Sequence, residues 1–297
     1  MIVLSFIIVN YNTCKMTREC IDSIFENTKY ITFEIILIDN ASIDESKVVF
    51  EKDDRIKYIY NQMNIGFGQA NNIGLEIAIG RNVLFLNSDT LLINNAIKIL
   101  SDFLDENNDA GACGGNMYNL HQKPSHSFGH FYPSILWEIN ILSYNFLAKI
   151  LYGKNADHNF SNRILEVAHI IGADLMVKKE VLEKIGGFDS HFFMYREETE
   201  LCYRISNMGY KLYSVPQAKI IHLEGKSVKK TTLEHKKVKW MLESNRTFLE
   251  MYHSKVYVYI AISIYKITVY TRIFMCGIFN KDRKNYWCTV KDILKSI

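Results

Sequence analysis

Residues 1–115 alternate short apolar runs with amphipathic stretches, and this alternation constrains the fold more than any other feature of the chain. Residues 2–9 form a continuous apolar run, as a strand covered on both faces requires. Shorter runs at 33–38, 56–60 and 83–86 predict three further strands. Strands that alternate with helices usually form a mainly parallel sheet. The sequence therefore predicts an α/β domain whose Rossmann-like mixed central sheet is flanked by helices.

The segments between these runs carry apolar residues at helical spacing. Residues 15–26 predict a helix with Thr13 as its N-cap, and residues 68–79 predict a helix closed by Gly80. Residues 117–165 show no clean period and predict a long loop with some helix. Beyond this loop the pattern predicts, in order, a strand at 168–177, a helix closed at Gly186-Gly187, a helix at 198–207 that ends at Gly209, and strands at 211–215 and 218–222.

The bulk composition narrows the class of protein. A net charge of +3 is too small for nucleic acid to be the main partner. Six cysteines occur without a Cys-x-x-Cys pair or a nearby histidine at zinc spacing, so we interpret them as reduced thiols. The apolar start of the chain lacks a basic leader and is too short for a signal peptide. These features predict a cytoplasmic protein, and they do not address its oligomeric state.

The C-terminal stretch 257–279 is strongly apolar, but Lys266 and Arg272 interrupt it. Its longest uncharged run, 256–265, has about half of the ~20 residues needed to span a bilayer. Interleaved tyrosines and basic residues are typical of an interfacial amphipathic helix. A lysine-rich segment at 226–239 supports contact with an anionic surface. We therefore predict peripheral association with the inner face of the plasma membrane; the alternative is a helix packed on the rest of the protein.

Polar clusters follow three of the predicted strands. In an open α/β sheet, ligands bind beyond the carboxyl ends of the strands. Each cluster alone is an ordinary turn or helix cap, but three at consecutive strand ends predict one binding crevice. The clusters are Asn10-Tyr11-Asn12, Asp39-Asn40-Ala41-Ser42 and Asn87-Ser88-Asp89.

The residue types in this crevice suit a nucleoside diphosphate. Asp39 can accept hydrogen bonds from a base N–H or from ribose hydroxyls. A divalent ion on a carboxylate neutralises a diphosphate, and Asp89 at a strand tip is the candidate ligand. The structural alternative for Asp89 is a helix N-cap.

Longer motifs accompany the three strand-end clusters, the second of which continues to Asp44. They are Asn64-Ile65-Gly66-Phe67-Gly68, Asn71-Asn72, Gly172-Ala173, Gly186-Gly187-Phe188-Asp189, Phe192-Phe193-Met194-Tyr195, Glu197-Glu198-Thr199-Glu200-Leu201, Arg204, and His222-x-x-Gly225. The order and spacing of these motifs over residues 3–227 resemble glycosyltransferase family 2, and in particular its rhamnosyltransferase-like branch in bacterial polysaccharide synthesis.

The resemblance implies a GT-A fold with a nucleotide-binding half at 1–115, an acceptor half at 116–227 and a helical amphipathic region at 228–297. It also implies a nucleoside-diphosphate sugar donor and a divalent metal, Mg²⁺ or Mn²⁺. The residues it assigns to the donor are Asn10, Tyr11, Asn12, Asp39, Asn40, Ser42, Gly66, Asn71, Asn72, Asn87 and Ser88. The family's Asp-x-Asp motif reads Asn87-Ser88-Asp89 here, so Asp89 is the main acidic metal ligand.

The resemblance further implies that Glu198 is the catalytic base, with Glu197 as the alternative, and that His222 is a second metal or diphosphate contact. Displacement at an anomeric carbon requires a carboxylate near the acceptor hydroxyl. Acidic residues in the first turn of a helix also favour the helix dipole without any function, and His222 can be an ordinary strand-end histidine. For Arg204 we expect a structural pairing with a neighbouring carboxylate.

The predicted activity is inverting transfer of a sugar from a dTDP-rhamnose or UDP-hexose type donor to a hydroxyl of a lipid-linked or polysaccharide acceptor. Three other functions share some of these sequence features. A nucleotidyltransferase requires a Gly-rich basic loop after the first strand, which is absent. An NAD enzyme is disfavoured because Gly66 and Gly68 follow the third strand. A catalytically silent homologue that serves as a binding or scaffold subunit stays open, because Glu198 and Asn87 depart from the family pattern.

Overall fold

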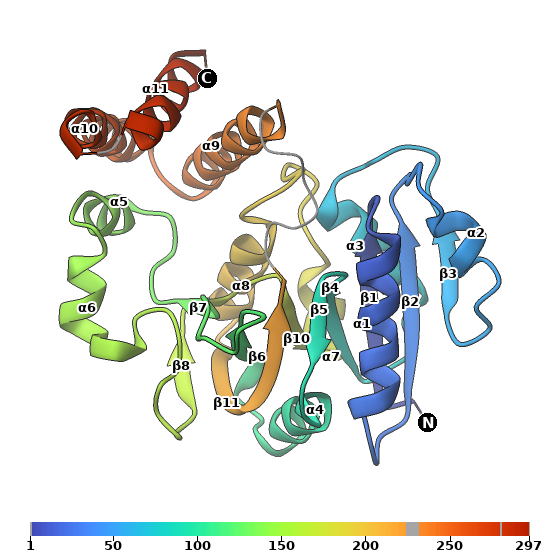
Figure 1. Cartoon of the computed structure of the whole chain (residues 1–297). Helices are drawn as coiled ribbons and strands as arrows, with labels where there is room; N and C mark the ends of the chain where they lie inside the picture. Colours follow the sequence, from blue (N-terminus) through green and yellow to red (C-terminus); the bar gives the residue numbers. More distant parts are fainter. Residues whose placement is uncertain (1, 224–231, 280, 297) are drawn as a thin grey trace. The chain divides into compact units, whose positions relative to one another are not determined.

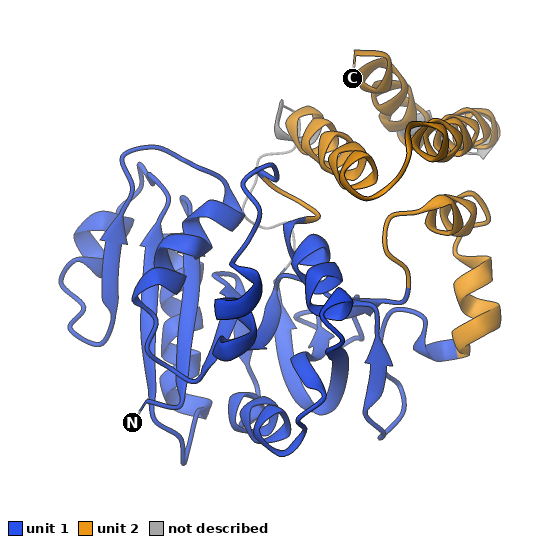
Figure 2. Ribbon diagram, turned by 180° about the vertical axis from the view of Figure 1, so that it is seen from behind, with its two compact units in different colours: residues 1–130, 154–193, 197–227 blue, residues 131–153, 194–196, 228–297 orange. Residues whose placement is uncertain are grey.

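The computed structural model describes residues 2–223, 232–279 and 281–296, so residues 226–231 of the lysine-rich segment lie outside the described part. The chain divides into two compact units (Figure 2). Unit 1 comprises residues 1–130, 154–193 and 197–227, and unit 2 comprises residues 131–153, 194–196 and 228–297. The grouping of 131–153 with the C-terminal helices was not predicted from the sequence.

Unit 1 is built on a mixed sheet. Among the described residues, nine strands belong to this sheet, in the order β3-β2-β1-β4-β10-β6-β11-β5, with β8 paired to β11 (Figure 1). β1 to β4 are parallel to one another, whereas β10 runs antiparallel to both β4 and β6. The strands are β1 (Leu4–Asn10), β2 (Phe33–Asp39), β3 (Lys57–Tyr60), β4 (Asn82–Asn87), β5 (Thr90–Leu92), β6 (Ala110–Tyr118), β8 (Leu165–Val167), β10 (Asp174–Lys178) and β11 (Lys211–His222); β7 (Phe128–Gly129) and β9 (His169–Ile170) pair separately.

Helices cover both faces of this sheet (Figure 1). α4 packs on β6, β10 and β11, α3 packs on β1 and β2, and α8 packs on β6, β9 and β11. The helices of unit 1 are α1 (Cys14–Asn27), α2 (Ser46–Phe50), α3 (Phe67–Ile77), α4 (Ala96–Glu106), α7 (Lys179–Ile185) and α8 (Glu197–Asn207). The two-sided covering explains why the first strands read as continuous apolar runs rather than as alternating ones.

The strand pleat assigns alternate residues to the two covered faces. Phe6 and Ile8 of β1 join Ile21 of α1 in one continuous core cluster. On the opposite face Ile7 meets α3, where a Cβ at Gly74 would lie 2.5 Å from the Ile7 Cγ2. Phe85 of β4 lies there too, edge-on to Phe188 with ring centroids 4.7 Å apart. Each fully buried side chain of this size contributes ~1.5–3 kcal/mol.

Several sequence expectations are corrected in detail. α3 ends at Ile77 with Ala78 as its C-cap, so Gly80 does not close it. Gly80 instead passes against β1, where a Cβ would lie 2.4 Å from the backbone N of Ser5. The two predicted strands at 211–215 and 218–222 are one strand, β11, with a register shift between Ser214 and Lys219. Gly186 does terminate α7, at φ 83°.

Unit 2 is helical. Its described helices are α5 (Ile135–Leu142), α6 (Phe146–Tyr152), α9 (Thr232–Tyr252), α10 (Lys255–Phe279) and α11 (Lys281–Ser296), and a short 3-10 turn, Gly153–Asn155, follows α6. Val238, Leu242, Val269, Val290 and Ile293 form one apolar cluster among α9, α10 and α11, and Leu249, Val258 and Ala261 form another at the α9–α10 end. The described apolar residues of this unit are thus divided between small cores.

α10 carries a broad exposed apolar face. Its segment Lys255–Ile278 is long and apolar enough, by length and composition alone, to cross a membrane, and only 28% of its most apolar window is buried. Arg272 is not on the exposed face: it is 7% exposed and donates from Nη2 to the Ile141 carbonyl at 2.7 Å. One of the two charges that interrupt this stretch in sequence is therefore turned into unit 2.

Candidate functional site

The polar clusters after β1, β2 and β4 meet at one edge of the sheet, and side-chain hydrogen bonds join them. Asn10 Nδ2 donates to Ser42 Oγ at 3.0 Å, which links the ends of β1 and β2. Thr13 Oγ1 and Ser88 Oγ are 3.2 Å apart, which links the end of β1 to the end of β4. The crevice predicted from three separate sequence clusters is therefore one connected polar surface.

Glu198 reaches the same edge from the other half of the unit. The Asn87 N–H donates to the Ala173 carbonyl at 3.1 Å, just before β10. At the preceding residue, a Cβ on Gly172 would lie 3.4 Å from the Glu198 Cβ. Gly172 thus lets the first turn of α8 approach the strand end that carries Asn87. The side chain of Glu198 is half-buried, whereas Glu197 is only 5% exposed.

Asp89 and His222 form the acidic and imidazole part of the site. Asp89 Oδ1 and His222 Nε2 are 3.2 Å apart, with side chains 16% and 12% exposed. The pairing is fixed by the backbone, because the Leu223 N–H donates to the Asp89 carbonyl at 2.9 Å and His222 faces Thr90 in the β5–β11 ladder. The family resemblance assigns both residues, which lie more than a hundred positions apart, to a metal or diphosphate contact, and that role stays a prediction.

A carboxylate oxygen and an imidazole nitrogen this close together suit a divalent cation. Among the described residues, no group of three or more His, Cys, Asp and Glu side chains is placed to hold a metal. A cation at Asp89 and His222 would therefore take its remaining ligands from a bound diphosphate and from water, as Mg²⁺ sites commonly do. The residues present fit such an ion.

Other predicted donor residues are used inside the protein. Asp39 is fully buried; its Oδ1 accepts the Ser42 N–H at 2.8 Å and its Oδ2 accepts the Tyr58 hydroxyl at 2.9 Å. Burial and the Asp39 carboxylate raise the pKa of Tyr58. Asn10 Oδ1 accepts the Thr17 hydroxyl at 2.8 Å. These contacts hold the strand ends in place, and direct donor contact by Asp39 and Asn10 stays a prediction.

Asn40 organises the loop that precedes α3. Its Oδ1 accepts the Ile65 N–H at 3.1 Å, and its Nδ2 donates to Asn64 Oδ1 at 2.9 Å and to the Gly66 carbonyl at 3.2 Å. Gly66 has φ 88°, and a Cβ there would lie 2.4 Å from the Phe193 carbonyl oxygen. The position therefore requires glycine for conformation and for space.

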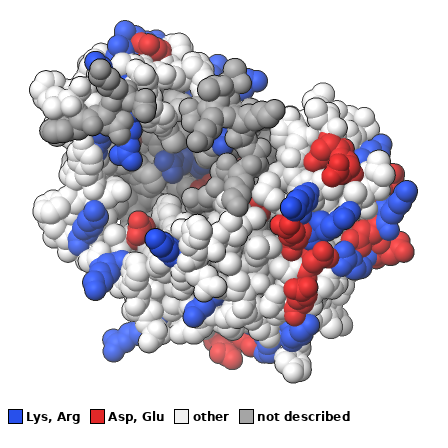
Figure 3. Space-filling view, in the orientation of Figure 1, with Lys and Arg blue, Asp and Glu red and all other residues white. Residues whose placement is uncertain are grey.

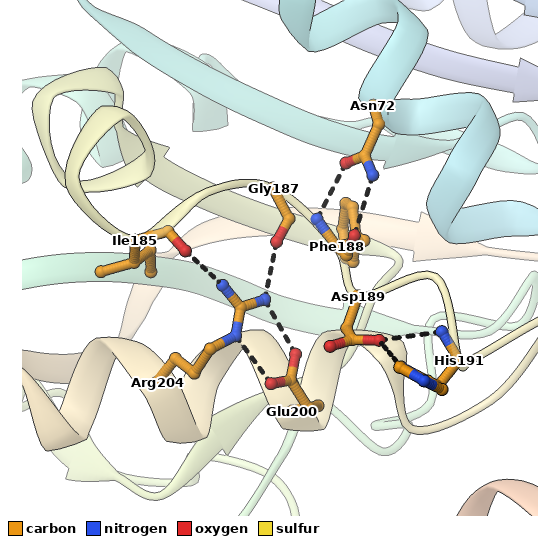
Figure 4. A network of polar contacts seen from close by, with 8 residues as sticks. All are labelled: Asn72, Ile185, Gly187, Phe188, Asp189, His191, Glu200 and Arg204. Atoms are coloured by element: carbon orange, nitrogen blue, oxygen red, sulfur yellow. Dashed lines mark hydrogen bonds and ion pairs between the residues drawn. The ribbon is translucent and has the colours of Figure 1, made fainter.

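Asn71 and Asn72 also have structural partners. Asn71 is 1% exposed and donates to the Phe67 carbonyl at 3.0 Å. The Asn72 amide faces the main chain of Phe188 in Figure 4, donating to its carbonyl and accepting its N–H, both at 2.8 Å. Asn72 thereby ties α3 to the turn after α7. The donor role predicted for both asparagines remains untested by these contacts.

Arg204 anchors the same turn from α8 (Figure 4). Its Nε lies 2.6 Å from Oε1 of the fully buried Glu200, and its Nη groups donate to the carbonyls of Ile185 at 2.8 Å and Gly187 at 2.6 Å. The structural pairing expected for Arg204 is observed. Through this network the helix that carries Glu198 is fixed to the turn that Asn72 holds.

Fewer residues are accessible at this end of the sheet than the sequence assigned to the donor. Tyr11 is 49% exposed, and Asn12, Ser88 and Asp89 are half-buried. Asn12 has φ 56°, and its Oδ1 accepts the Ile43 N–H at 2.8 Å. Beside these residues, over α1 and the β3 side, Lys and Arg intermix with Asp and Glu (Figure 3), as in the Arg55–Asp22 pair at 2.9 Å.

Sequence reasoning missed several residues that support the site. Thr13 is the N-cap residue of α1, as predicted, but its side chain makes no capping hydrogen bond, and Asp44 Oδ2 instead accepts the Cys14 N–H at 3.1 Å. Burial alone would raise the pKa of Asp44, but hydrogen bonds from Ser46 and Cys14 lower it. Asp174 is fully buried, and burial raises its pKa well above the usual range. The only sequence signal for Asp44 was its place two residues after Ser42 in the family-like motif.

A mixed α/β sheet with acidic and amide side chains at the carboxyl ends of its strands is typical of the α/β domains that bind a ligand there, often a nucleotide. The sequence model described as "Glycosyl transferase family 2" matches residues 5–197, and the chain therefore belongs to glycosyl transferase family 2. This confirms the family suggested by the sequence motifs.

Relatives and solved structures agree with this assignment. "Glycosyltransferase GlyG" of Streptococcus pneumoniae is 27% identical over 61% of this chain and 58% of its own length, so the chain spans little more than half of that relative. "dTDP-rhamnosyl transferase RfbF" of Shigella flexneri is 26% identical over 75% of this chain and 70% of its own. A Pyrobaculum calidifontis mannosyltransferase, solved "in complex with GDP-Man and Mn2+", is 15% identical with a TM-score of 0.57 over 99% of this chain and 85% of that one. The predicted GT-A fold is confirmed.

Proposed function

We propose that this protein is an inverting glycosyltransferase that transfers a sugar from a nucleoside diphosphate to a hydroxyl of an acceptor glycan. The observation that carries the proposal is that two chemically different groups lie at the same end of the sheet. The Asp89–His222 pair lies on one side, and Glu198 approaches the same strand end through Gly172 and Ala173. Membership of glycosyl transferase family 2 supports the reaction class.

Each group has a separate task in the proposed reaction. Glu198 accepts the proton of the acceptor hydroxyl while the oxygen of that hydroxyl bonds to the anomeric carbon. The bond from that carbon to the diphosphate breaks on the opposite face, and the diphosphate leaves. Asp89 and His222 would hold a divalent cation, Mg²⁺ or Mn²⁺, which supplies charge stabilisation for the leaving diphosphate when bound. A single displacement of this kind inverts the anomeric configuration.

The donor proposed for this site is a dTDP-rhamnose or UDP-hexose type of nucleotide sugar. The dTDP-rhamnosyl transferase among the relatives supports the first, and the Mn²⁺ and nucleotide sugar bound by the Pyrobaculum enzyme support a metal-assisted site. Tyr11 and Asn12, at the accessible edge, are placed to contact the base or the ribose. The buried Asp39 would position that edge through Ser42.

We further propose that the acceptor is lipid-linked and that the protein works peripherally at the inner face of the plasma membrane. The support is the exposed apolar stripe of α10, where Val256 is 70% exposed, Phe274 is 69% exposed and Ile278 is 61% exposed. Exposed apolar area of this kind favours interfacial contact. The opposite side of α10 packs in unit 2, as expected for a helix that lies on a membrane rather than across it.

A thermal-shift panel of dTDP, UDP and GDP, each with and without Mn²⁺, tests the donor site. A ligand at 100 to 1,000 times its dissociation constant should stabilise the fold by ~3–4 kcal/mol. We expect one nucleotide to raise the melting temperature, to do so more strongly with Mn²⁺, and to lose the Mn²⁺ increment in Asp89→Asn. No shift with any nucleotide would contradict the donor site and favour a silent scaffold subunit.

A further inference from the structure

Unit 2 contains a cavity of about 900 Å³ between its small apolar cores. Leu242 and Val269 on its wall belong to the core among α9, α10 and α11, and Leu249 and Val258 belong to the core at the α9–α10 end. The volume equals on the order of 30 water molecules at their liquid volume. The space is open to solvent on the side of Tyr259 and Tyr270, and its size lies within the range of ligand-binding clefts.

Apolar and polar side chains both line the cavity, and several of the polar ones are basic. Five basic and two acidic residues line it. Lys255, Lys266 and Lys295 make no ion pair with any carboxylate in the part of the chain that the structure describes. Arg246, by contrast, is paired with Glu250 at 2.7 Å. The uncompensated lysines give the cavity a positive charge that suits an anionic group.

Two buried acceptors in the wall lack a partner. Glu138 is 1% exposed; its Oε1 accepts Asn245 Nδ2 at 3.1 Å, while its Oε2 and Asn245 Oδ1 have no hydrogen-bond partner. An unpartnered buried oxygen costs roughly 1–3 kcal/mol. A purely apolar occupant would leave this cost in place, whereas an occupant with a hydroxyl group would remove it.

The cavity borders the exposed apolar stripe of α10. Tyr259 and Tyr270 line the cavity and are also 74% and 57% exposed. Ile262 lies in the wall three positions after Tyr259. The stripe and the cavity therefore share side chains of α10, and one lipid chain can contact both.

We propose that this cavity binds the apolar chain of a lipid phosphate, with Lys266 and Lys295 at the phosphate and with Glu138 and Asn245 hydrogen-bonded to a hydroxyl. The chemistry is shared by a lipid-linked sugar acceptor and by a membrane phospholipid. In the first case the inference rests on the proposed function and names its acceptor class. If the ligand is a membrane phospholipid, the cavity is a membrane-lipid site that does not depend on the proposed function. Lipid binding is therefore measured separately from sugar transfer.

Titration calorimetry of the full chain with farnesyl phosphate, below its micellar concentration, tests the proposal. Ile262→Trp fills the cavity and should weaken binding at least tenfold. Met251→Trp adds the same side chain at a 40% exposed position of α9 that does not line the cavity, and it should change affinity less than twofold. If Ile262→Trp does not fold, Leu294→Trp on the α11 wall replaces it. Equal affinity in the cavity and surface variants would overturn the assignment.

Further titrations test two points separately: whether the phosphate charge contributes to binding, and which kind of lipid the cavity prefers. Lys266→Gln with Lys295→Gln should weaken farnesyl phosphate about tenfold and leave farnesol unchanged, while Lys284→Gln, which does not line the cavity, should alter neither. Farnesol bound as tightly as farnesyl phosphate by the unaltered protein would refute the phosphate assignment. Tighter binding of farnesyl phosphate than of phosphatidylglycerol supports an acceptor site, and the reverse supports a membrane-lipid site. Because dTDP and UDP binding is recorded in parallel, failure of the cavity and failure of the proposed function give different results.

Discussion

Unit 1 and unit 2 differ in how they bury apolar side chains and in where they leave polar ones. In unit 1 a large apolar cluster runs from β1 through α1 and α4 to β11 on one face of the sheet, and Ile7 and Phe85 are buried on the other face. Polar side chains gather at the carboxyl ends of β1, β2 and β4. In unit 2 the described apolar residues form small separate clusters beside a large cavity, and much of α10 is exposed. A continuous core suits a site whose atoms must be held in fixed positions, and a divided core suits adaptable contact with apolar partners.

The largest expected effect is on chemistry in unit 1. Glu198→Gln removes the proposed base while keeping its size, and turnover should fall by about 10²- to 10⁴-fold. Nucleotide binding by calorimetry should change little, because the Asp89–His222 pair is untouched. Glu197→Gln is the matched comparison. A larger loss of turnover in Glu197→Gln than in Glu198→Gln would move the base to Glu197.

The next effect is on the stability of unit 1. Arg204→Met leaves the fully buried Glu200 without its cation and two carbonyls without donors. Breaking such a pair costs ~3–5 kcal/mol, measured by urea denaturation. Lys179→Met removes a surface pair with Glu183 at 3.8 Å and should cost less than about 1 kcal/mol. Similar costs for the two variants would mean that the Figure 4 network does not stabilise the fold.

Unit 2 should differ from unit 1 in its response to pH. Burial raises the pKa of Glu138 to about 7. The unfolded chain releases this proton near pH 4.5 and the folded chain keeps it, so stability falls as pH rises between these values. Relative to Glu138→Gln, the unaltered protein should lose on the order of 3 kcal/mol between pH 4.5 and pH 8. Parallel pH profiles of denaturation for the two proteins would show that Glu138 is ionised when folded.

A smaller effect on stability should distinguish alanine substitutions at two glycines of unit 1. Gly66→Ala places a Cβ 2.4 Å from the Phe193 carbonyl oxygen at φ 88°. Gly209→Ala has φ 86° but nothing within 4 Å. Gly209→Ala should therefore cost ~1–2 kcal/mol from conformation alone, and Gly66→Ala clearly more in the same denaturation assay. Equal losses would show that the loop before α3 yields to the new side chain.

The smallest effect on stability is expected at the exposed face of unit 2. Phe274→Ser removes a side chain that is 69% exposed and should change unfolding by less than about 0.5 kcal/mol. Sedimentation with anionic vesicles should nevertheless fall several-fold if α10 contacts the membrane. Met208→Ser, 55% exposed in unit 1, is the control. Unchanged sedimentation of Phe274→Ser would contradict the membrane contact.

The sequence predicted the elements whose apolar pattern is locally complete. β1, β2 and β4 are continuous apolar runs, and the helix predicted at 15–26 is observed as α1. β6 was not predicted, because Ala110–Tyr118 begins Ala-Gly-Ala-Cys-Gly-Gly. Its small residues are required by neighbours from distant positions: a Cβ at Gly115 would lie 2.7 Å from the Ala218 carbonyl oxygen. Such a requirement is not visible in local propensity.

The sequence indicated which residues lie near the site, but not which way their side chains point. Asp89 and His222 were assigned together from motifs and are adjacent. Asn10 and Asn40 were assigned to the donor from the same motifs, yet their amides bind Ser42 and the 64–66 loop. An asparagine after a strand can face a ligand or the protein, and which it does depends on partners such as Thr17 and Ile65 that no local pattern identifies.

The place of β10 in the sheet also bears on synthesis of the chain. β10 lies between β4 and β6, although about ninety residues separate it from β4 in sequence. At roughly 5–20 residues per second, a ribosome needs several seconds to supply it. During that interval the Val83–Leu84–Phe85–Leu86 edge, already paired on its β1 side, has no second neighbour. Such an edge is prone to pair with other chains, so the nascent protein should depend on chaperones until residue 178 has emerged.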